Sequence, residues 1–351
     1  MDLCNLRSCV QKRISKCWNL VGIALRPKSS LKFSALLPKQ QLHSYFIPFM
    51  SGANLAKALA SKGITLIHGS HNETVKHLVK LREKKSYRHE QRSVLVQGQT
   101  TIQELLDRNI KLRSIGLTLS KGVDHLELDR KKFPAERYFV CDINNTRRIL
   151  GTASQPTANE MFAEVELPHV EFSPAVDKLI VFNNISDPGN LGTLVRTAKA
   201  LGWTTAVLTD NTCDLTNDKT IRASKAAVID YPHKIIPSSQ LIDYLVKTMH
   251  MTPIVADTPP HDITDTLSSN TGIFFWKKTS GQHLDKLPDR IALILSSEHH
   301  GPSHIDPNVL RVSIPMASNV ESLNVSSAGS ILLFQLNQLL GSPGQDVNVR
   351  R

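Results

Sequence analysis

Short apolar runs alternate with amphipathic runs along residues 62 to 166. The strand-like runs centre on residues 64–68, 93–97, 114–119 and 137–141, and the helix-like runs on 73–85, 101–109 and 144–150. This alternation predicts a small α/β domain. The following segment, 155–174, contains three prolines and few periodic positions, so we expect it to link this domain to the next one.

The alternation becomes more regular from residue 178 onward. The predicted strands cover residues 179–182, 205–208, 253–256, 273–276, 291–295 and 310–314, and the predicted helices 192–201, 220–228, 239–249 and 322–340. Short apolar strands separated by helices indicate a parallel sheet that is covered on both faces. In such sheets ligands bind beyond the carboxyl ends of the strands.

Charge is distributed unevenly over the 351 residues, which suffice for two ordinary domains and a tail. Residues 1–72 contain ten Lys or Arg and a single acid, Asp2, so they carry +9 of the formal net charge of +11. The high isoelectric point is therefore mostly a property of the N-terminus. It does not by itself indicate that the folded body binds nucleic acid.

A basic, acid-poor N-terminus with interspersed Ser and apolar residues is typical of a mitochondrial transit peptide. We therefore predict a presequence over residues 1–50 and a location in the mitochondrial matrix. A basic arm that contacts RNA directly is the alternative for this segment. The sequence also contains no apolar run approaching the ~20 residues of a membrane-spanning helix, and no membrane association is predicted.

Three of the five cysteines, Cys4, Cys9 and Cys17, fall in the predicted presequence. The other two, Cys141 and Cys213, have no CxxC spacing, so the sequence predicts neither a disulfide framework nor a zinc site. We expect both to be buried or half-buried thiols. The adjacent His299 and His300 lack further ligands at a suitable spacing, and no metal is predicted.

The first segment with candidate chemistry is 184–198, which follows a predicted strand and opens a helix. Asp187, Pro188 and Gly189 predict a tight turn. Asn190 and Gly192 are expected to let the backbone approach a ligand at the helix N-terminus, with Arg196 in the first turns of the helix. By itself the segment is better explained as an ordinary strand–turn–helix joint that carries a surface arginine.

Two further segments place polar residues at predicted strand ends. In 295–301, the small residue Ser296 precedes Glu298, which is expected to accept hydrogen bonds or to hold Arg196. In 314–328, Ser322 and Asn324 are natural helix N-caps. There is no GxGxxG after the first strand and no GxxxxGK[ST], which disfavours an ordinary dinucleotide site and a P-loop.

These three segments, in this order and spacing, resemble the three motifs of the SpoU family of SPOUT methyltransferases. The run IPMxxxxESLNVS, which begins at Ile314, is the most telling. The resemblance implies an α/β fold with a parallel-sheet methyltransferase domain over residues 175–345 and a C-terminal trefoil knot. It also implies a small α/β RNA substrate-binding domain over residues 51–166, S-adenosyl-L-methionine as cofactor, and a homodimer.

Roles for individual residues are implied by the same resemblance. The cofactor-binding positions would be Ser296, Ile314, Met316 and Leu323. The catalytic set would be Arg196, Asn190, Glu298, Ser322 and Asn324. The family usually has Gly where this chain has Ser296, and a second Gly sooner than Gly301.

The function implied is methylation of a ribose 2′-hydroxyl in RNA, with mitochondrial ribosomal RNA as the expected substrate. A transfer-RNA 2′-O-methyltransferase and a non-catalytic RNA-binding assembly relative remain as alternatives, the second because of Ser296. Seven Lys or Arg between residues 76 and 92 form a candidate phosphate-binding face, or else a solvated surface.

Overall fold

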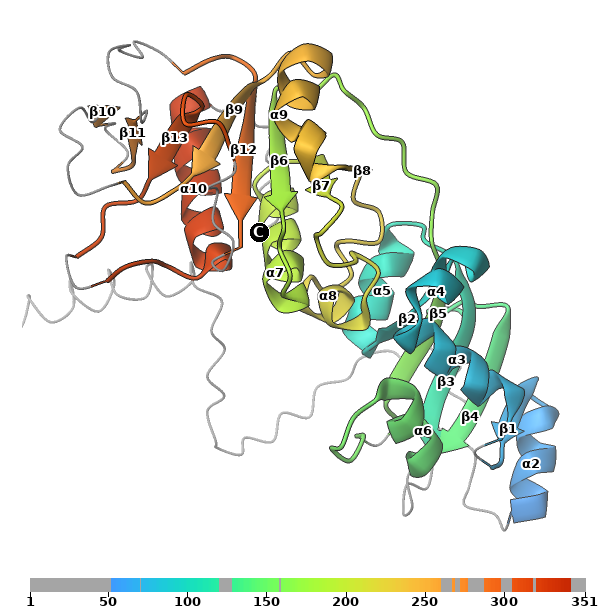
Figure 1. Cartoon of the computed structure of the whole chain (residues 1–351). Coiled ribbons are helices and arrows are strands. Elements are labelled where there is room, and N and C mark those ends of the chain that lie inside the picture. Colours follow the sequence, from blue (N-terminus) through green and yellow to red (C-terminus); the bar gives the residue numbers. More distant parts are fainter. Residues whose placement is uncertain are drawn as a thin grey trace, which may run out of the picture. The chain divides into compact units, whose positions relative to one another are not determined.

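The computed structural model describes residues 52–69, 71–119, 128–157, 159–259, 267–268, 272–276, 287–297, 305–317 and 320–341. All of them fall within one unit, residues 43–351. Their helices and strands are labelled in Figure 1. The predicted presequence, residues 1–50, lies outside the described residues.

The N-terminal part of the described chain is built on a five-stranded sheet with the order β1-β4-β3-β5-β2. Strands β1, β4 and β3 run parallel, whereas β5 is antiparallel to both β3 and β2. The strands are β1 (Ile64–Ile67), β2 (Ser93–Gln97), β3 (Leu112–Leu119), β4 (Arg137–Asp142) and β5 (Met161–Glu166). The helices are α2 (Gly52–Ala60), α3 (Glu73–Glu83), α4 (Lys85–Gln91), α5 (Gln99–Asp107) and α6 (Ile143–Leu150).

Strand β5 corrects the prediction that residues 155–174 form only a link. It lies inside the sheet, between β3 and β2 (Figure 1). The sequence pattern hid it because Glu164 occupies a position that is only 2% exposed, and this charged residue interrupts an otherwise apolar run. A charged residue is rarely buried to this extent unless it is paired.

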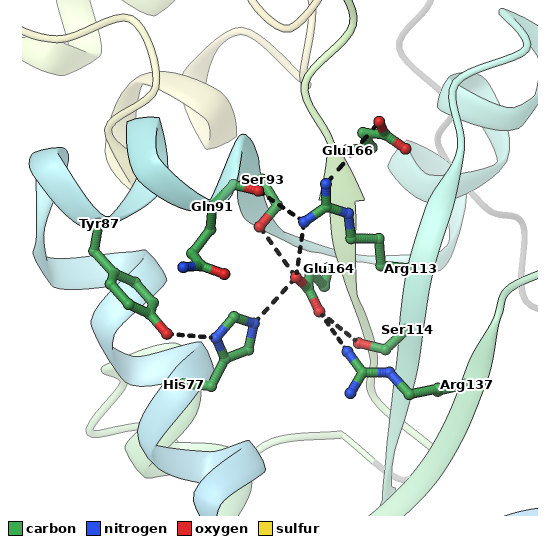
Figure 2. Close-up of polar contacts among 9 residues, drawn as sticks. All are labelled: His77, Tyr87, Gln91, Ser93, Arg113, Ser114, Arg137, Glu164 and Glu166. Carbon is green, nitrogen blue, oxygen red and sulfur yellow. Dashed lines mark hydrogen bonds and ion pairs between the residues drawn. The ribbon is translucent and has the colours of Figure 1, made fainter.

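Glu164 is the centre of a buried polar cluster, shown in Figure 2. Its carboxylate accepts hydrogen bonds from His77 Nε2 at 3.0 Å, Ser93 Oγ at 3.0 Å and Arg137 Nη2 at 3.2 Å. Burial raises the pKa of the Glu164 carboxyl, but the hydrogen bonds from His77 and Ser93 and the charge of Arg137 outweigh burial. The pKa of Glu164 therefore lies below its ordinary value, and the buried position is stabilised as a carboxylate.

The C-terminal part is built on an eight-stranded sheet with the order β10-β11-β13-β9-β12-β6-β7-β8. The six strands from β13 to β8 are parallel, which confirms the predicted parallel sheet, and β11 and β10 continue it antiparallel. The strands are β6 (Lys178–Asn183), β7 (Ala206–Thr209), β8 (His233–Ile236), β9 (Thr252–Ala256), β10 (Leu267–Ser268), β11 (Phe274–Trp276), β12 (Ile291–Ser296) and β13 (Leu310–Ser313).

Helices cover both faces of the parallel strands. On one face α7 (Pro188–Ala200) and α10 (Val325–Leu340) pack against strand residues such as Phe182 and Leu295. The other face is covered by an irregular helical segment made of η1 (Ser238–Gln240), α9 (Leu241–Asp243) and η2 (Tyr244–Thr248). Helix α8 (Asp218–Ala223) contacts α7. Within the described ranges, no helix is long and apolar enough to span a membrane.

Among the helices that differ in extent from the predictions, three do so for a clear local reason. Helix α7 begins at Pro188 because Asp187 is its N-cap, and α10 begins at Val325 because Asn324 caps it by accepting from Ser326 N. Helix α8 ends at Ala223, ahead of two residues with positive φ, Lys225 (47°) and Ala226 (59°), which leave the right-handed helical region.

The candidate basic face between residues 76 and 92 is divided between α3 and α4, and part of it faces the protein. Arg88 is 3% exposed, donates to the carbonyls of Leu81 and Arg82, and pairs with Asp214 at 2.6 Å. Burial raises the pKa of Asp214, but the hydrogen bonds from Arg88 and Thr216 outweigh it and leave this pKa below its ordinary value. Arg88 is therefore not available to a phosphate.

Candidate active site

A pocket of about 230 Å³ lies where β9, β12 and β13 end and α10 begins. This is the carboxyl edge of the parallel strands, where ligands are expected in such sheets. Its lining includes Ala256, Asp257, Thr258, Leu295, Ser296, Ser297, Val312, Ser313, Ile314, Met316, Ser322, Leu323, Val325, Ala328 and Leu332.

All four residues predicted to bind a cofactor lie together in this lining. They come from the end of β12 (Ser296), the segment after β13 (Ile314 and Met316) and the segment before α10 (Leu323). Ser322, which was predicted to belong to the catalytic set, lies in the same lining. The structure thus brings the second and third sequence motifs to one place.

Ser296, the residue that departs from the family pattern, has a defined partner. Its Oγ accepts a hydrogen bond from Asn183 Nδ2 at 3.0 Å, and the two residues are register partners on the adjacent parallel strands β12 and β6. The hydroxyl is therefore held to the neighbouring strand at the edge of the pocket.

The N-terminus of α7 differs from the prediction that its backbone opens toward a ligand. The Asp187 carboxylate accepts a hydrogen bond from Asn190 N at 2.7 Å, so the helix is capped by its own chain. Gly192 is required by packing. A Cβ at this position would lie 2.5 Å from the carbonyl oxygen of Thr220, which places α7 close to α8.

A hydrogen bond joins the first and third motifs. Asn324 Nδ2 donates to Asn190 Oδ1 at 3.2 Å, which links the start of α7 to the N-cap of α10. Neither residue belongs to the pocket lining. The two asparagines therefore fix the relative position of two helix ends beside the pocket.

Arg196 lies on the exposed side of α7, and it does not belong to the pocket lining. Glu298, the residue predicted to hold it, lies outside the described residues. The structure thus places Arg196 on the exposed surface of α7 and not among the pocket-lining residues.

Sequence reasoning missed one pocket residue, Asp257, which directly follows β9. It is the only charged side chain among the described lining residues. Its position after an apolar strand is the same kind of signal that drew attention to Ser296. The apolar run 253–256 and the rule that ligands bind at strand ends were sufficient to find it.

The two thiols outside the N-terminal segment are buried or half-buried, as predicted. Burial raises the pKa of Cys141 to about 11, and burial together with the charges of Asp187 and Asp214 raises the pKa of Cys213 to about 12. Both thiols are therefore protonated and unreactive at neutral pH. In the part of the chain that the structure describes, no cluster of three or more His, Cys, Asp or Glu could hold a metal ion.

Comparison with known proteins connects this pocket to a family. The sequence profile of the SpoU rRNA Methylase family matches residues 177–334. This range includes strands β6 to β13, the pocket lining and most of α10. Over these residues the chain is similar to the SpoU family. The SpoU assignment agrees with the resemblance of the three motifs.

Two curated relatives align with about three quarters of this chain. A 23S rRNA (guanosine(2553)-2′-O)-methyltransferase of Bacillus subtilis is 25% identical over 276 residues, which cover 77% of this chain and 98% of that protein. The mitochondrial rRNA methyltransferase 3 of Mus musculus is 24% identical over 307 residues, covering 75% of this chain and 71% of that protein.

Solved structures share the fold. An AdoMet-bound rRNA methyltransferase from Sinorhizobium meliloti superposes with a TM-score of 0.59 at 19% identity, covering 80% of this chain and all of that one. An RNA 2′-O ribose methyltransferase superposes with the same TM-score of 0.59 at 21% identity, covering 78% of this chain and 99% of that one.

Proposed function

We propose that this chain is an S-adenosylmethionine-dependent enzyme that methylates a ribose 2′-hydroxyl of mitochondrial ribosomal RNA. The observation that carries the proposal is the convergence of Ser296, Ile314, Met316 and Leu323 on one pocket of a SpoU domain. Relatives named as rRNA 2′-O-methyltransferases and as mitochondrial rRNA methyltransferases support the substrate and the compartment. The basic, acid-poor N-terminus supports the compartment as well.

The pocket suits a nucleoside-like cofactor. Small side chains such as Ala256 and Ser297 leave the strand-end backbone accessible, and Met316 and Leu323 supply apolar surface. A few polar groups in an apolar pocket are typical of cofactor sites. When bound, S-adenosylmethionine supplies a methyl group on a positively charged sulfur, which is already electrophilic.

Arg196 is proposed to act on the RNA. A guanidinium is always protonated, so it donates hydrogen bonds and does not remove a proton. Its exposed position on α7 suits binding of the target phosphate and stabilisation of the charge that develops on the 2′-oxygen. Asn190, Ser322, Asn324 and Glu298 are proposed to position Arg196, the ribose or the cofactor.

The N-terminal sheet and its helices are proposed to form the RNA substrate-binding domain, residues 51–166. Exposed cations on and beside α3 and α4 remain available for phosphates: Lys80, Lys84, Lys85 and Arg92. The C-terminal trefoil knot of the methyltransferase domain, residues 175–345, is part of the same proposal.

A homodimer is also proposed, with α10 at the dimer interface. Ile331 and Phe334 are 39% and 51% exposed on this helix, three residues apart on one face, whereas Leu332, Leu333 and Leu336 are buried. Two large exposed apolar side chains on one helix face are a self-complementary surface for a twofold axis. The exposed Arg196 lies on α7, the helix against which α10 packs.

Replacing both Ile331 and Phe334 with glutamate is expected to convert the dimer to monomers, because each protomer would bury two charges in the dimer interface. Sedimentation velocity measures the change. The matched control is Ile235→Glu, on the edge strand β8, where the side chain is 54% exposed. A wild-type chain that sediments as a monomer would contradict the dimer.

The test of the function uses residues 51–351. Titration calorimetry should show binding of S-adenosylmethionine, and the protein should transfer a labelled methyl group to protein-free mitochondrial ribosomal RNA. Nuclease digestion should place the label on a ribose. Labelling of transfer RNA alone would mean that the substrate is transfer RNA and not ribosomal RNA. Binding of RNA without binding of the cofactor would indicate a non-catalytic assembly protein.

A further inference from the structure

Asp257 stands apart from the other residues of the pocket. The remaining described lining side chains are apolar or carry a hydroxyl, so Asp257 is the single charged residue among them. Its side chain is 18% exposed. Because an ionised carboxylate only accepts hydrogen bonds, the part of a ligand beside Asp257 must carry donors.

The carboxylate is fixed from behind by Arg311, on the neighbouring strand β13. Arg311 Nη1 pairs with Asp257 Oδ2, and Arg311 itself is completely buried. Its guanidinium lies 5.5 Å from the ring of Trp276, and among the described residues its Nε has no hydrogen-bond partner. A buried guanidinium of this kind depends on its carboxylate, since an unpaired buried charge is strongly destabilising.

The backbone of Asp257 is fixed as well. Ser313 Oγ donates to the Asp257 carbonyl at 2.5 Å and accepts from Trp276 Nε1 at 2.7 Å. Asp257 Oδ1 accepts from Thr258 N at 2.9 Å. Strand β13 thus fixes both the side chain and the backbone of Asp257, and each carboxylate oxygen keeps further acceptor capacity for a ligand.

We infer that Asp257 binds the ribose hydroxyls of the nucleoside cofactor, with Arg311 as the residue that positions it. A carboxylate at a strand end matches a vicinal diol, which offers two donors at the spacing of two carboxylate oxygens. The inference rests on the proposed function, because it assigns a role within the same pocket. It adds a specificity-determining residue that selects a riboside.

The ammonium group of the methionine part is the competing donor for the same carboxylate. A binding experiment that removes one donor at a time from the ligand and the carboxylate from the protein separates the two cases. The probes are S-adenosylhomocysteine, its 2′-deoxy and 3′-deoxy analogues, and the analogue without the amino group. Calorimetry measures the dissociation constant of each with wild type and with Asp257→Asn.

With wild type, loss of a ribose hydroxyl is expected to weaken binding roughly ten- to a hundred-fold, the usual effect of a hydrogen bond to a charged group. With Asp257→Asn, the parent ligand should bind correspondingly more weakly, and the deoxy analogues should bind almost as well as the parent. The amino-group penalty should be the same in both proteins. Asp243→Asn, a paired but 72% exposed aspartate, is the matched control and should behave as wild type.

Arg311→Lys retains the charge but loses the guanidinium geometry, so it should reduce the discrimination between riboside and deoxyriboside only in part. If Asp257→Asn does not fold, the wild-type measurements decide alone: equal affinity for riboside and deoxyribosides overturns the inference. An amino-group penalty that disappears in Asp257→Asn overturns it also. Failure of wild type to bind any of the probes would instead reject the proposed cofactor site.

Discussion

Replacing Arg196 with alanine is expected to lower the rate of methyl transfer by roughly 10²- to 10³-fold, the effect of removing one donor that stabilises developing negative charge. Binding of S-adenosylmethionine should not change, because Arg196 does not belong to the pocket lining. Single-turnover kinetics with saturating cofactor measures the rate, and calorimetry measures the cofactor affinity.

The kinetic parameters separate the two roles proposed for Arg196. Loss of phosphate binding raises KM for RNA, whereas loss of charge stabilisation lowers kcat. Arg196→Lys should restore part of the phosphate binding, since a lysine keeps the charge but not the planar set of donors. Arg222→Ala is the matched control, because Arg222 is a 46% exposed arginine on the adjacent helix α8. Full activity of Arg196→Ala would remove this residue from the mechanism.

Replacing Glu164 with glutamine is expected to destabilise the five-stranded sheet by about 2 kcal/mol at pH 7, because hydrogen bonds to a charged group contribute roughly 1.5–3 kcal/mol. The loss lies in the lower part of that range because Arg137 is 63% exposed, so water can solvate its guanidinium once the carboxylate is gone. The cluster also contains His77, Arg113 and Glu166 (Figure 2). None of these can replace the one acceptor oxygen that becomes an amide NH2 group at the buried position.

The same carboxylate makes stability depend on pH. The pKa of Glu164 is lower in the folded than in the unfolded chain, so its contribution is fully present above the unfolded pKa. It is lost as the pH falls through the lower, folded pKa. Wild type should therefore lose stability in this acid range more steeply than Glu164→Gln.

Amide hydrogen exchange followed by mass spectrometry is the suitable measurement, because it reports the opening of β2, β3 and β5 separately from the rest of the chain. Tryptophan fluorescence is unsuitable, since Trp203 and Trp276 both lie in the C-terminal part. Glu166→Gln is the matched control on the same strand, where the nearest cation, Arg113, is 4.0 Å away and the glutamate is 39% exposed. Equal exchange in both variants would contradict the role of the buried cluster.

Sequence patterns predicted most strands, and the residues that they singled out as cofactor-binding line one pocket. Apolar runs such as 93–97 and 253–256 agree closely with β2 and β9, because their periodicity is local and their ends are marked by polar residues. The residues around Ser296 and Leu323 were found because the order and spacing of the motifs can be recognised in the sequence, even though the segments are far apart along the chain. Nothing in the periodicity, however, indicated which strands are neighbours.

Features that depend on distant partners could not be predicted. Strand β5 was missed because Glu164 looks exposed until His77 and Arg137 are brought beside it. Arg88 looked like a surface cation until Asp214, far along the chain, proved to be its partner. Gly192 looked like a ligand contact because the approach of α8 is a property of packing and leaves no local signal.

The strand order of the second sheet has a consequence for how the protein folds. Strand β12 inserts between β9 and β6, and it pairs with β6 across more than a hundred residues, Lys178 with Ile291. Pairings of such long range form slowly, because chain entropy is lost before contacts compensate for it. On the ribosome, the pocket cannot form before α10 has been synthesised, because Val325, Ala328 and Leu332 of this helix line it. A ligand that binds only the completed pocket would stabilise the folded protein. The lifetime of newly made protein would then increase with the concentration of that ligand.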